Sequence, residues 1–140
     1  MPVRALVYVS QKSERLGEHE LEAVVADAAK FNATADVTGI LLFDGQRFLQ
    51  YLEGPEAGLE AAFSRVCAAA SHSEIMLLAG GIVGARFYPS WSMMLIGADR
   101  SSLGQIASGD WNGFVRRGGA ARPTAMDNML TLTEKPIHVR

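Results

Sequence analysis

Three polar side chains interrupt segments that are otherwise apolar, and their types suit the binding of a polar ligand. Tyr8 lies in the run VRALVYVS, Asn32 ends an apolar helical pattern, and Gln50 lies in the run FLQYLEG. A neutral phenol can give up an electron and a proton, and a carboxamide both donates and accepts hydrogen bonds. Together these groups favour a ligand site over plain core packing.

Gln50 raises the sharpest question, because alternate residues of a strand share a face and Gln50 therefore lies with Phe48 and Leu52. If that apolar face is buried, the amide is buried too, and each unmet polar group costs about 1–3 kcal/mol. Each polar residue taken singly has a structural explanation: a half-buried tyrosine, an asparagine cap and a solvent-facing glutamine. Their joint placement between a sheet and its helices favours the ligand.

The elements that would position these residues follow from hydrophobic periodicity. Strands are predicted over residues 3–10, 37–44, 47–54, 75–84 and 91–98. Amphipathic helices are predicted over 20–32 and from Pro55 to about residue 70. The Asp44-Gly45 pair predicts a hairpin, and Gly80-Gly81 predicts a bend or bulge in the fourth strand.

This order of elements predicts an α+β fold, a ferredoxin-like βαββαβ sandwich with a fifth strand and both helices on one sheet face. The first and third strands should be neighbours, with the fifth strand beside the third. Short C-terminal helices, starting near Ser101 and after Pro123, should pack on the open sheet face or on a partner. We therefore expect one domain over 1–98 and a helical extension over 99–140.

Composition excludes several classes of function. The chain has 140 residues, 49% of them hydrophobic, which is enough for one core, and its net charge of −2 without a basic cluster argues against nucleic-acid binding. One cysteine, Cys67, predicted to be buried, and three scattered histidines give no metal-ligand spacing. Since no signal peptide and no apolar run of membrane-spanning length is visible, we expect a cytoplasmic protein without membrane attachment.

Catalytic motifs are absent from the sequence. It contains neither GxSxG nor GxxxxGK[ST], and no pair of carboxylates suggests a catalytic cleft. Glu53 and Glu56 flank the predicted start of the second helix, where acidic residues favour the helix dipole. The sequence therefore predicts that the chain is not an enzyme.

Four segments, in this order and spacing, resemble one family. They are LVYVS (6–10), FNATADVTGILLFDGQRFLQYLEG (31–54), SHSEI (71–75) and RFYPSWSMML (86–95). From Val3 to Gly97 the chain resembles the BLUF domains, which are blue-light sensors using flavin, and its tail resembles that of the short single-domain members. The resemblance implies a flavin held between the two helices, namely FAD, with FMN or riboflavin as alternatives.

The resemblance also assigns photoactive residues. Gln50 matches the glutamine that lies between the flavin and a strand-one tyrosine, here Tyr8. Electron and proton transfer within this group would rearrange hydrogen bonds, by rotation or tautomerisation of Gln50, and give a reversible red-shifted state. Trp91 and Met93 match a pair that exchanges places in some members.

Further residues are implied to bind the cofactor. Asn32 and Arg65 match positions at the pyrimidine edge of the flavin, and His72 matches a position near the ribityl chain. Helix residues implied to line the site are Val24, Val25, Ala28, Phe31 and Val66. Many relatives carry asparagine at the position of Phe31, and several carry serine at the position of Ala28. The flavin site of this chain is therefore expected to be more apolar than the site of those relatives.

Since the sequence shows no appended effector domain, we expect a light signal to pass to a downstream protein in trans. One open sheet face and an apolar tail that need burial favour a homo-oligomer. The alternative is a colourless ligand-binding or dimerisation module of the same fold. Such a module would not need Tyr8, Asn32 and Gln50 together, and colour separates the two hypotheses.

Overall fold

A computed structural model describes residues 2–117 and 122–134; His138 and parts of the tail lie outside this range. The strands are β1 (Val3–Lys12), β2 (Thr38–Phe43), β3 (Arg47–Gly54), β4 (His72–Val83) and β5 (Met94–Gly97). The helices are α1 (Glu18–Thr34), α2 (Glu56–Ala68), α3 (Arg100–Ala107) and α4 (Ala125–Thr133), with a 3-10 turn η1 (Asn112–Phe114). Within the described ranges, the helices fall short of the length and apolarity that crossing a membrane requires.

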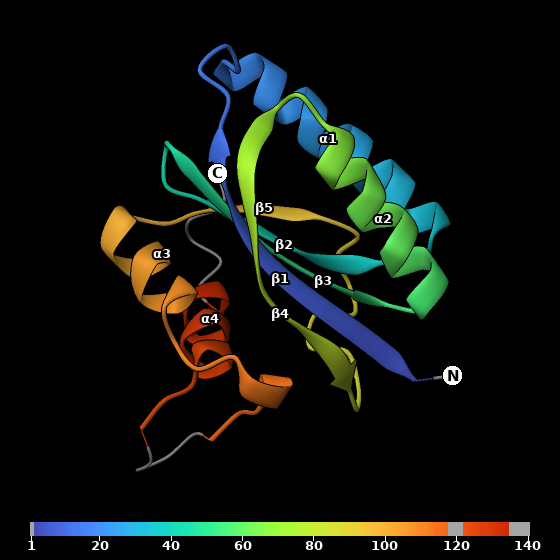
Figure 1. Cartoon of the computed structure of the whole chain (residues 1–140), viewed down its shortest axis with the longest axis vertical. Coiled ribbons are helices and arrows are strands. Elements are labelled where there is room, and N and C mark those ends of the chain that lie inside the picture. The colour runs from blue at the N-terminus through green and yellow to red at the C-terminus, as the bar shows by residue number, and fades with distance from the viewer. Residues whose placement is uncertain (1, 118–121, 135–140) are drawn as a thin grey trace.

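The strands form one mixed sheet in the order β4-β1-β3-β2-β5. Helices α1 and α2 cover one face of this sheet, and α3 and α4 lie on the other (Figure 1). The antiparallel register of β1 and β3 sets Tyr8 directly opposite Gln50. The predicted ferredoxin-like α+β fold, with the first and third strands as neighbours, is confirmed.

The fifth strand differs from the prediction in both length and position. It covers only Met94–Gly97, and it pairs in parallel with β2, where Ile40 lies opposite Met94. The placement beside the third strand was wrong, because β1 and β2 already occupy both edges of β3. Trp91 therefore lies in the connection that precedes β5 rather than within a strand.

The irregularities of β4 also differ from the prediction. Its register against β1 shifts between Val7 and Tyr8 and again between Val9 and Gln11, whereas Gly80 and Gly81 pair regularly. The glycines permit a bulge without requiring one. The second shift falls near Glu74, whose φ of 54° departs from strand geometry.

The Asp44-Gly45 hairpin is confirmed. Gly45 has a φ of 101°, which favours glycine, and one carboxylate oxygen of Asp44 accepts from the backbone N–H groups of Gln46 and Arg47 at 2.9 and 2.7 Å. The turn therefore fixes the register of β2 against β3 and the face on which Gln50 lies.

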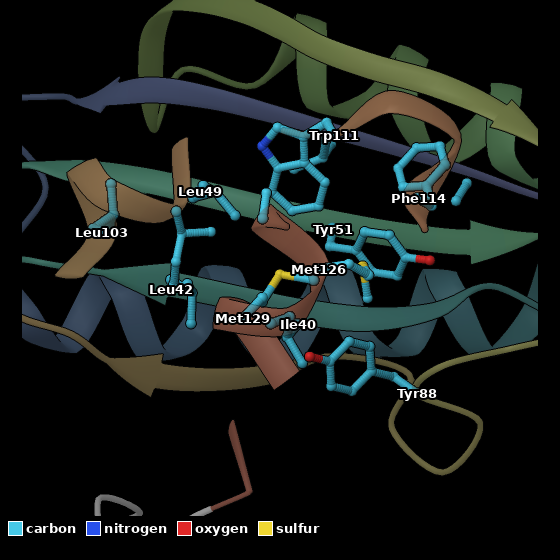
Figure 2. Packing of buried hydrophobic residues seen from close by; sticks show 14 of the residues in the cluster. Ile40, Leu42, Leu49, Tyr51, Tyr88, Leu103, Trp111, Phe114, Met126 and Met129 are labelled. Carbon is cyan, nitrogen blue, oxygen red and sulfur yellow. The ribbon is translucent and has the colours of Figure 1, made fainter. Parts of the chain in front are cut away.

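The larger apolar core lies on the sheet face away from α1 and α2. Sheet side chains there meet buried residues of the tail (Figure 2), namely Leu103, Ile106, Trp111, Phe114, Met126 and Met129. Helix α4 begins after Thr124, whose hydroxyl accepts from the N–H of Asp127 while the Asp127 carboxylate accepts from the N–H of Thr124. The tail thus covers the second face of the sheet.

Cys67 is exposed, so its predicted burial was wrong. The reason is that α2 buries only Leu59 and Ala62 fully. The apolar face predicted for the second helix is therefore wider than the face that α2 buries against the sheet.

Candidate functional site

A cavity of about 780 Å³ lies between the sheet and helices α1 and α2. Its volume falls in the range of small-molecule and cofactor sites. Side chains of β1, β3, both helices and the start of β4 line it, and Met93 reaches it from the connection before β5. Every predicted photoactive or cofactor-binding residue except Trp91 lines this one cavity.

Tyr8 and Gln50 meet inside the cavity wall. The Tyr8 hydroxyl donates to Oε1 of Gln50, and Nε2 of Gln50 donates to the sulfur of Met93 at 3.3 Å. Tyr8 is 2% exposed and Gln50 is 4% exposed. Both ends of the buried amide therefore have partners, which removes the penalty for burying it.

Burial, and secondly the neighbouring Cys67 thiol, raises the pKa of Tyr8 above its ordinary value near 10. The phenol therefore keeps its proton throughout the physiological range. A neutral Tyr8 can donate its hydrogen bond to Gln50 throughout that range.

The buried tyrosines predict a loss of stability at alkaline pH. Burial also raises the pKa of Tyr51 and Tyr88. These three phenols stabilise the folded chain fully below their unfolded pKa of about 10, and that stability is lost as the pH rises through the folded values. Each contributes a slope of about 1.4 kcal/mol per pH unit.

We expect Tyr8→Phe to reduce this slope by about 1.4 kcal/mol per pH unit above pH 10. Urea unfolding of the two proteins between about pH 8 and 11.5 measures the difference. If the free energy of unfolding fell with pH equally steeply in the two proteins, the raised pKa of Tyr8 would be contradicted.

Asn32 lies in the last turn of α1 and is buried. The side-chain Nδ2 of Asn32 donates to the backbone carbonyl of Ser92 at 2.9 Å. The backbone carbonyl of Asn32 accepts from the N–H of Val37 at 2.8 Å. The structure thus places Asn32 inside the helix rather than in a left-handed cap. Its side chain ties α1 to the connection that carries Met93.

His72 bridges three elements beside Tyr8. Its Nε2 lies 2.8 Å from the carbonyl of Val66 in α2, and its Nδ1 lies 2.6 Å from the hydroxyl of Ser10 in β1. Since a carbonyl only accepts, Nε2 carries a proton and donates it. The His72 and Tyr8 ring centroids are 5.9 Å apart, so His72 helps to fix the surroundings of the phenol.

The helices supply the apolar walls. The predicted residues Val24, Val25, Ala28, Phe31 and Val66 all line the cavity. The guanidinium of Arg65 lies 4.6 Å from the centroid of the Phe31 ring, a cation–π contact between α2 and α1. Apolar walls together with the amides of Asn32 and Gln50 in the lining fit a planar heteroaromatic ring that has a hydrogen-bonding edge, as a flavin does.

Comparison with known proteins identifies the family. Residues 3–94 match the family described as sensors of blue-light using FAD, BLUF. The chain belongs to the BLUF family. As a BLUF domain it is a flavin-binding blue-light sensor, and the cavity between α1 and α2 is where the chemistry of its lining fits the flavin.

The similar proteins are of different lengths. The blue light- and temperature-regulated antirepressor BluF of Escherichia coli (strain K12) is 34% identical over 90 residues, which cover 64% of this chain and 22% of BluF. The dark-state structure of BlrB, a BLUF protein, has a TM-score of 0.66 and 27% identity over 69% of this chain and 73% of that one. BlrP1 of Klebsiella pneumoniae has a TM-score of 0.63 and 32% identity over 68% of this chain and 24% of its own. The chain thus spans about a fifth of the curated relative BluF.

Trp91 lies outside the cavity of this BLUF domain. Its ring stacks on Tyr88, with centroids 5.9 Å apart and an interplanar angle of 23°, and its carbonyl accepts from the N–H of Gly39 at 2.8 Å. The structure therefore has Met93, and not Trp91, beside Gln50. The shift of β5 to the sheet edge accounts for the difference from the predicted strand position.

Several lining residues escaped sequence reasoning. Phe48 and Leu52 share the face of Gln50, so the strand alternation was a usable signal for them. The loop residues after β1 carry no periodic pattern that would mark them. The remaining lining residues are Ser13, Arg15, Leu16, Glu20, Leu21, Asp27, Leu41, Ala62, Ala69, Ala70 and Ser71.

Proposed function

We propose that this chain is an FAD-binding photoreceptor whose light response depends on the Tyr8–Gln50 hydrogen bond. The observation that carries the proposal is the set of contacts Tyr8–Gln50–Met93, buried in the wall of the cavity. A site built only for packing or for a colourless ligand has no need of an oxidisable phenol bonded to an amide.

The bound flavin supplies absorption of blue light and, once excited, a demand for an electron. Tyr8 is the group of this chain that would supply the electron, with its hydroxyl proton passing along the hydrogen bond to Gln50, and both would later return to it. Gln50 has a donor and an acceptor on one rotatable group, so it can hold more than one arrangement. After the return it is left rotated or tautomerised, with altered bonds to Tyr8 and Met93.

The cofactor contacts belong to the same proposal. Asn32 and Arg65 would hold the hydrogen-bonding edge of the ring, and His72 would lie near the chain attached to it. We propose FAD rather than FMN or riboflavin. Chromatography of the cofactor released by heat from purified protein tests this, and a single FMN peak would overturn it.

The output is proposed to reach another protein in trans, from a cytoplasmic chain that forms homo-oligomers and has no enzymatic activity. We divide the chain into a sensor over 1–98 and an output extension over 99–140. The packing of α3 and α4 on the sheet face opposite the cavity supports this division.

The deciding experiment is an absorption spectrum of purified protein before and after blue light, followed in the dark. We expect a flavin band that shifts to the red and returns. A flavin band that does not shift would overturn the roles of Tyr8 and Gln50. Protein that stays colourless after reconstitution with FAD would favour the colourless ligand-binding or dimerisation module.

A further inference from the structure

The cavity between the sheet and helices α1 and α2 has two distinct ends. Asn32 lines it from the last turn of α1, whereas Glu20 lines it from the first turn. The loop over residues 13–17, called here the 13–17 loop, leads from β1 into that first turn (Figure 1). It contributes three residues to the lining, namely Ser13, Arg15 and Leu16. The 13–17 loop therefore borders the cavity at the end away from Asn32.

His72 lies at the same end of the cavity as the 13–17 loop. It begins β4, and the carbonyl of Ser71, the residue before it, accepts from the N–H of Ser13 at 2.9 Å. In the proposed function, Asn32 holds the hydrogen-bonding edge of the flavin ring and His72 lies near the chain attached to that ring. A phosphate on this chain would therefore leave the cavity past His72 and meet the 13–17 loop.

The 13–17 loop is held in place by hydrogen bonds that leave one charged side chain unused. The Nζ of Lys12 donates to the carbonyls of Ser13 and Leu16 at 2.9 and 3.0 Å. The hydroxyl of Ser13 accepts from the backbone N–H of Arg15 at 3.3 Å. The side chain of Arg15 is exposed, and it forms neither an ion pair nor a hydrogen bond with any residue that the structure describes. The backbone of Arg15 is thus fixed, while its guanidinium is available to a ligand.

The charges around the cavity make Arg15 the cation that an anion at this end would meet. The side chains of the lining with a full charge are Arg15, Arg65, Glu20 and Asp27. The guanidinium of Arg65 lies over the ring of Phe31, and the carboxylate of Glu20 accepts from the N–H of Gly17 at 3.0 Å. An anion beside the 13–17 loop is therefore attracted by Arg15 and repelled by Glu20.

We propose that Arg15 selects flavins that carry a phosphate, by pairing its guanidinium with the phosphate on the chain that passes His72, and that Glu20 limits this selection. The inference rests on the proposed function and adds the residue that distinguishes a phosphorylated flavin from riboflavin. A guanidinium binds phosphate through charge-assisted, bidentate hydrogen bonds, and a phosphate monoester carries nearly two negative charges at neutral pH. Because the pair is exposed to solvent, its effect should be a few-fold and should weaken as salt is added.

The test measures the dissociation constants of riboflavin, FMN and FAD, from the quenching of flavin fluorescence by the whole chain after its flavin has been removed. Wild type is compared with Arg15→Gln and with Glu20→Gln, which keeps an oxygen that can accept from the N–H of Gly17. Arg4→Gln is the control, because it removes the same charge from an exposed pair with Glu56, outside the cavity lining. Each titration is made at about 20 mM and about 500 mM salt.

At low salt we expect wild type and Arg4→Gln to bind FMN and FAD at least about threefold more tightly than riboflavin. Arg15→Gln should bind all three flavins with similar dissociation constants, and its constant for riboflavin should be that of wild type. Glu20→Gln should increase the preference for FMN over riboflavin by about twofold, because a repulsive charge is removed. High salt should reduce the wild-type preference and leave Arg15→Gln unaffected.

A wild-type chain that binds riboflavin as tightly as FMN and FAD at low salt would overturn the inference, as would a full preference in Arg15→Gln. Equal weakening of all three flavins in Arg15→Gln would also overturn it, because a disturbed loop and not a lost phosphate contact gives that result. Arg15→Lys keeps the charge and should restore part of the preference.

The same titrations distinguish this inference from the proposed function. Loss of the phosphate preference leaves the proposed function intact if the FAD-loaded chain still shows its red shift. A preference for FMN over FAD would support the pairing with Arg15 while overturning the choice of FAD. A wild-type chain that binds none of the three flavins would overturn both the inference and the proposed function.

Discussion

Tyr8→Phe is expected to bind flavin and stay yellow, yet to lose the reversible red shift. The change keeps the ring that packs near Phe63 and His72, so the shape of the cavity is retained. It removes the O–H that Gln50 accepts, and it replaces an oxidisable phenol with a ring that has no proton to release. We expect the shift amplitude to fall at least about tenfold, because neither electron transfer nor the bond to Gln50 remains. Absorption difference spectra under saturating blue light measure it.

The matched control for this variant is Tyr88→Phe. It removes the same hydroxyl from another buried tyrosine, on the opposite face of the sheet, where the partner is Thr133. Tyr88→Phe should keep the full shift amplitude. Gln50→Leu removes the other half of the pair and should behave as Tyr8→Phe does. A full reversible shift in Tyr8→Phe would refute the role assigned to the phenol.

Gly58→Ala should destabilise the fold and weaken flavin binding. A Cβ at Gly58, in the first turn of α2, would lie 2.1 Å from the carbonyl oxygen of Ala35, just after α1. The helices must then separate at that point, and such overpacking costs about 1–3 kcal/mol. Because the two helices form the cavity walls, the flavin content of the purified protein should fall as well. Denaturant unfolding and the ratio of flavin to protein absorbance measure the two effects.

Gly104→Ala in α3 is the control for that substitution, and its expected sign is opposite. The nearest atom to a Cβ there is the end of the Arg47 side chain, at 3.5 Å, which is an ordinary contact. Replacing a helix-interior glycine by alanine then stabilises by about 0.5–1 kcal/mol. If Gly58→Ala were as stable as Gly104→Ala, the close approach of α2 to Ala35 would not be a constraint on the fold.

The central contacts of the site were predictable from the sequence because they follow from local alternation and one pairing. Period-two patterns in β1 and β3 put Tyr8 and Gln50 on inward faces, and their antiparallel pairing brings the two together. The walls followed from the helical periodicity of α1 and α2. The alternation and the helical periodicity are local patterns, so both can be recognised within short stretches of the sequence.

The features that escaped prediction depend on contacts between distant segments. No local signal tells which edge a fifth strand joins, so β5 was assigned to the wrong neighbour. The sequence around Glu53 indicates only an acidic residue near a helix start, because its partners at Phe87 and Tyr88 lie more than thirty positions away. Cys67 was assigned to the core since a helical stripe does not show how much of it the sheet covers.

The alternation along β3 separates two sets of constraints that share one strand. Residues 48, 50 and 52 face the cavity. On the other face, Leu49 and Tyr51 pack in the core that the tail completes, and Glu53 accepts hydrogen bonds from the backbone of Phe87 and Tyr88. Sequence divergence at the second set can adapt the sheet to a different C-terminal layer while the first set preserves the light-absorbing unit. Chimaeras that join this sensor to another effector should therefore be designed by varying Leu49 and Tyr51 together with the new tail, and by leaving Phe48, Gln50 and Leu52 as they are.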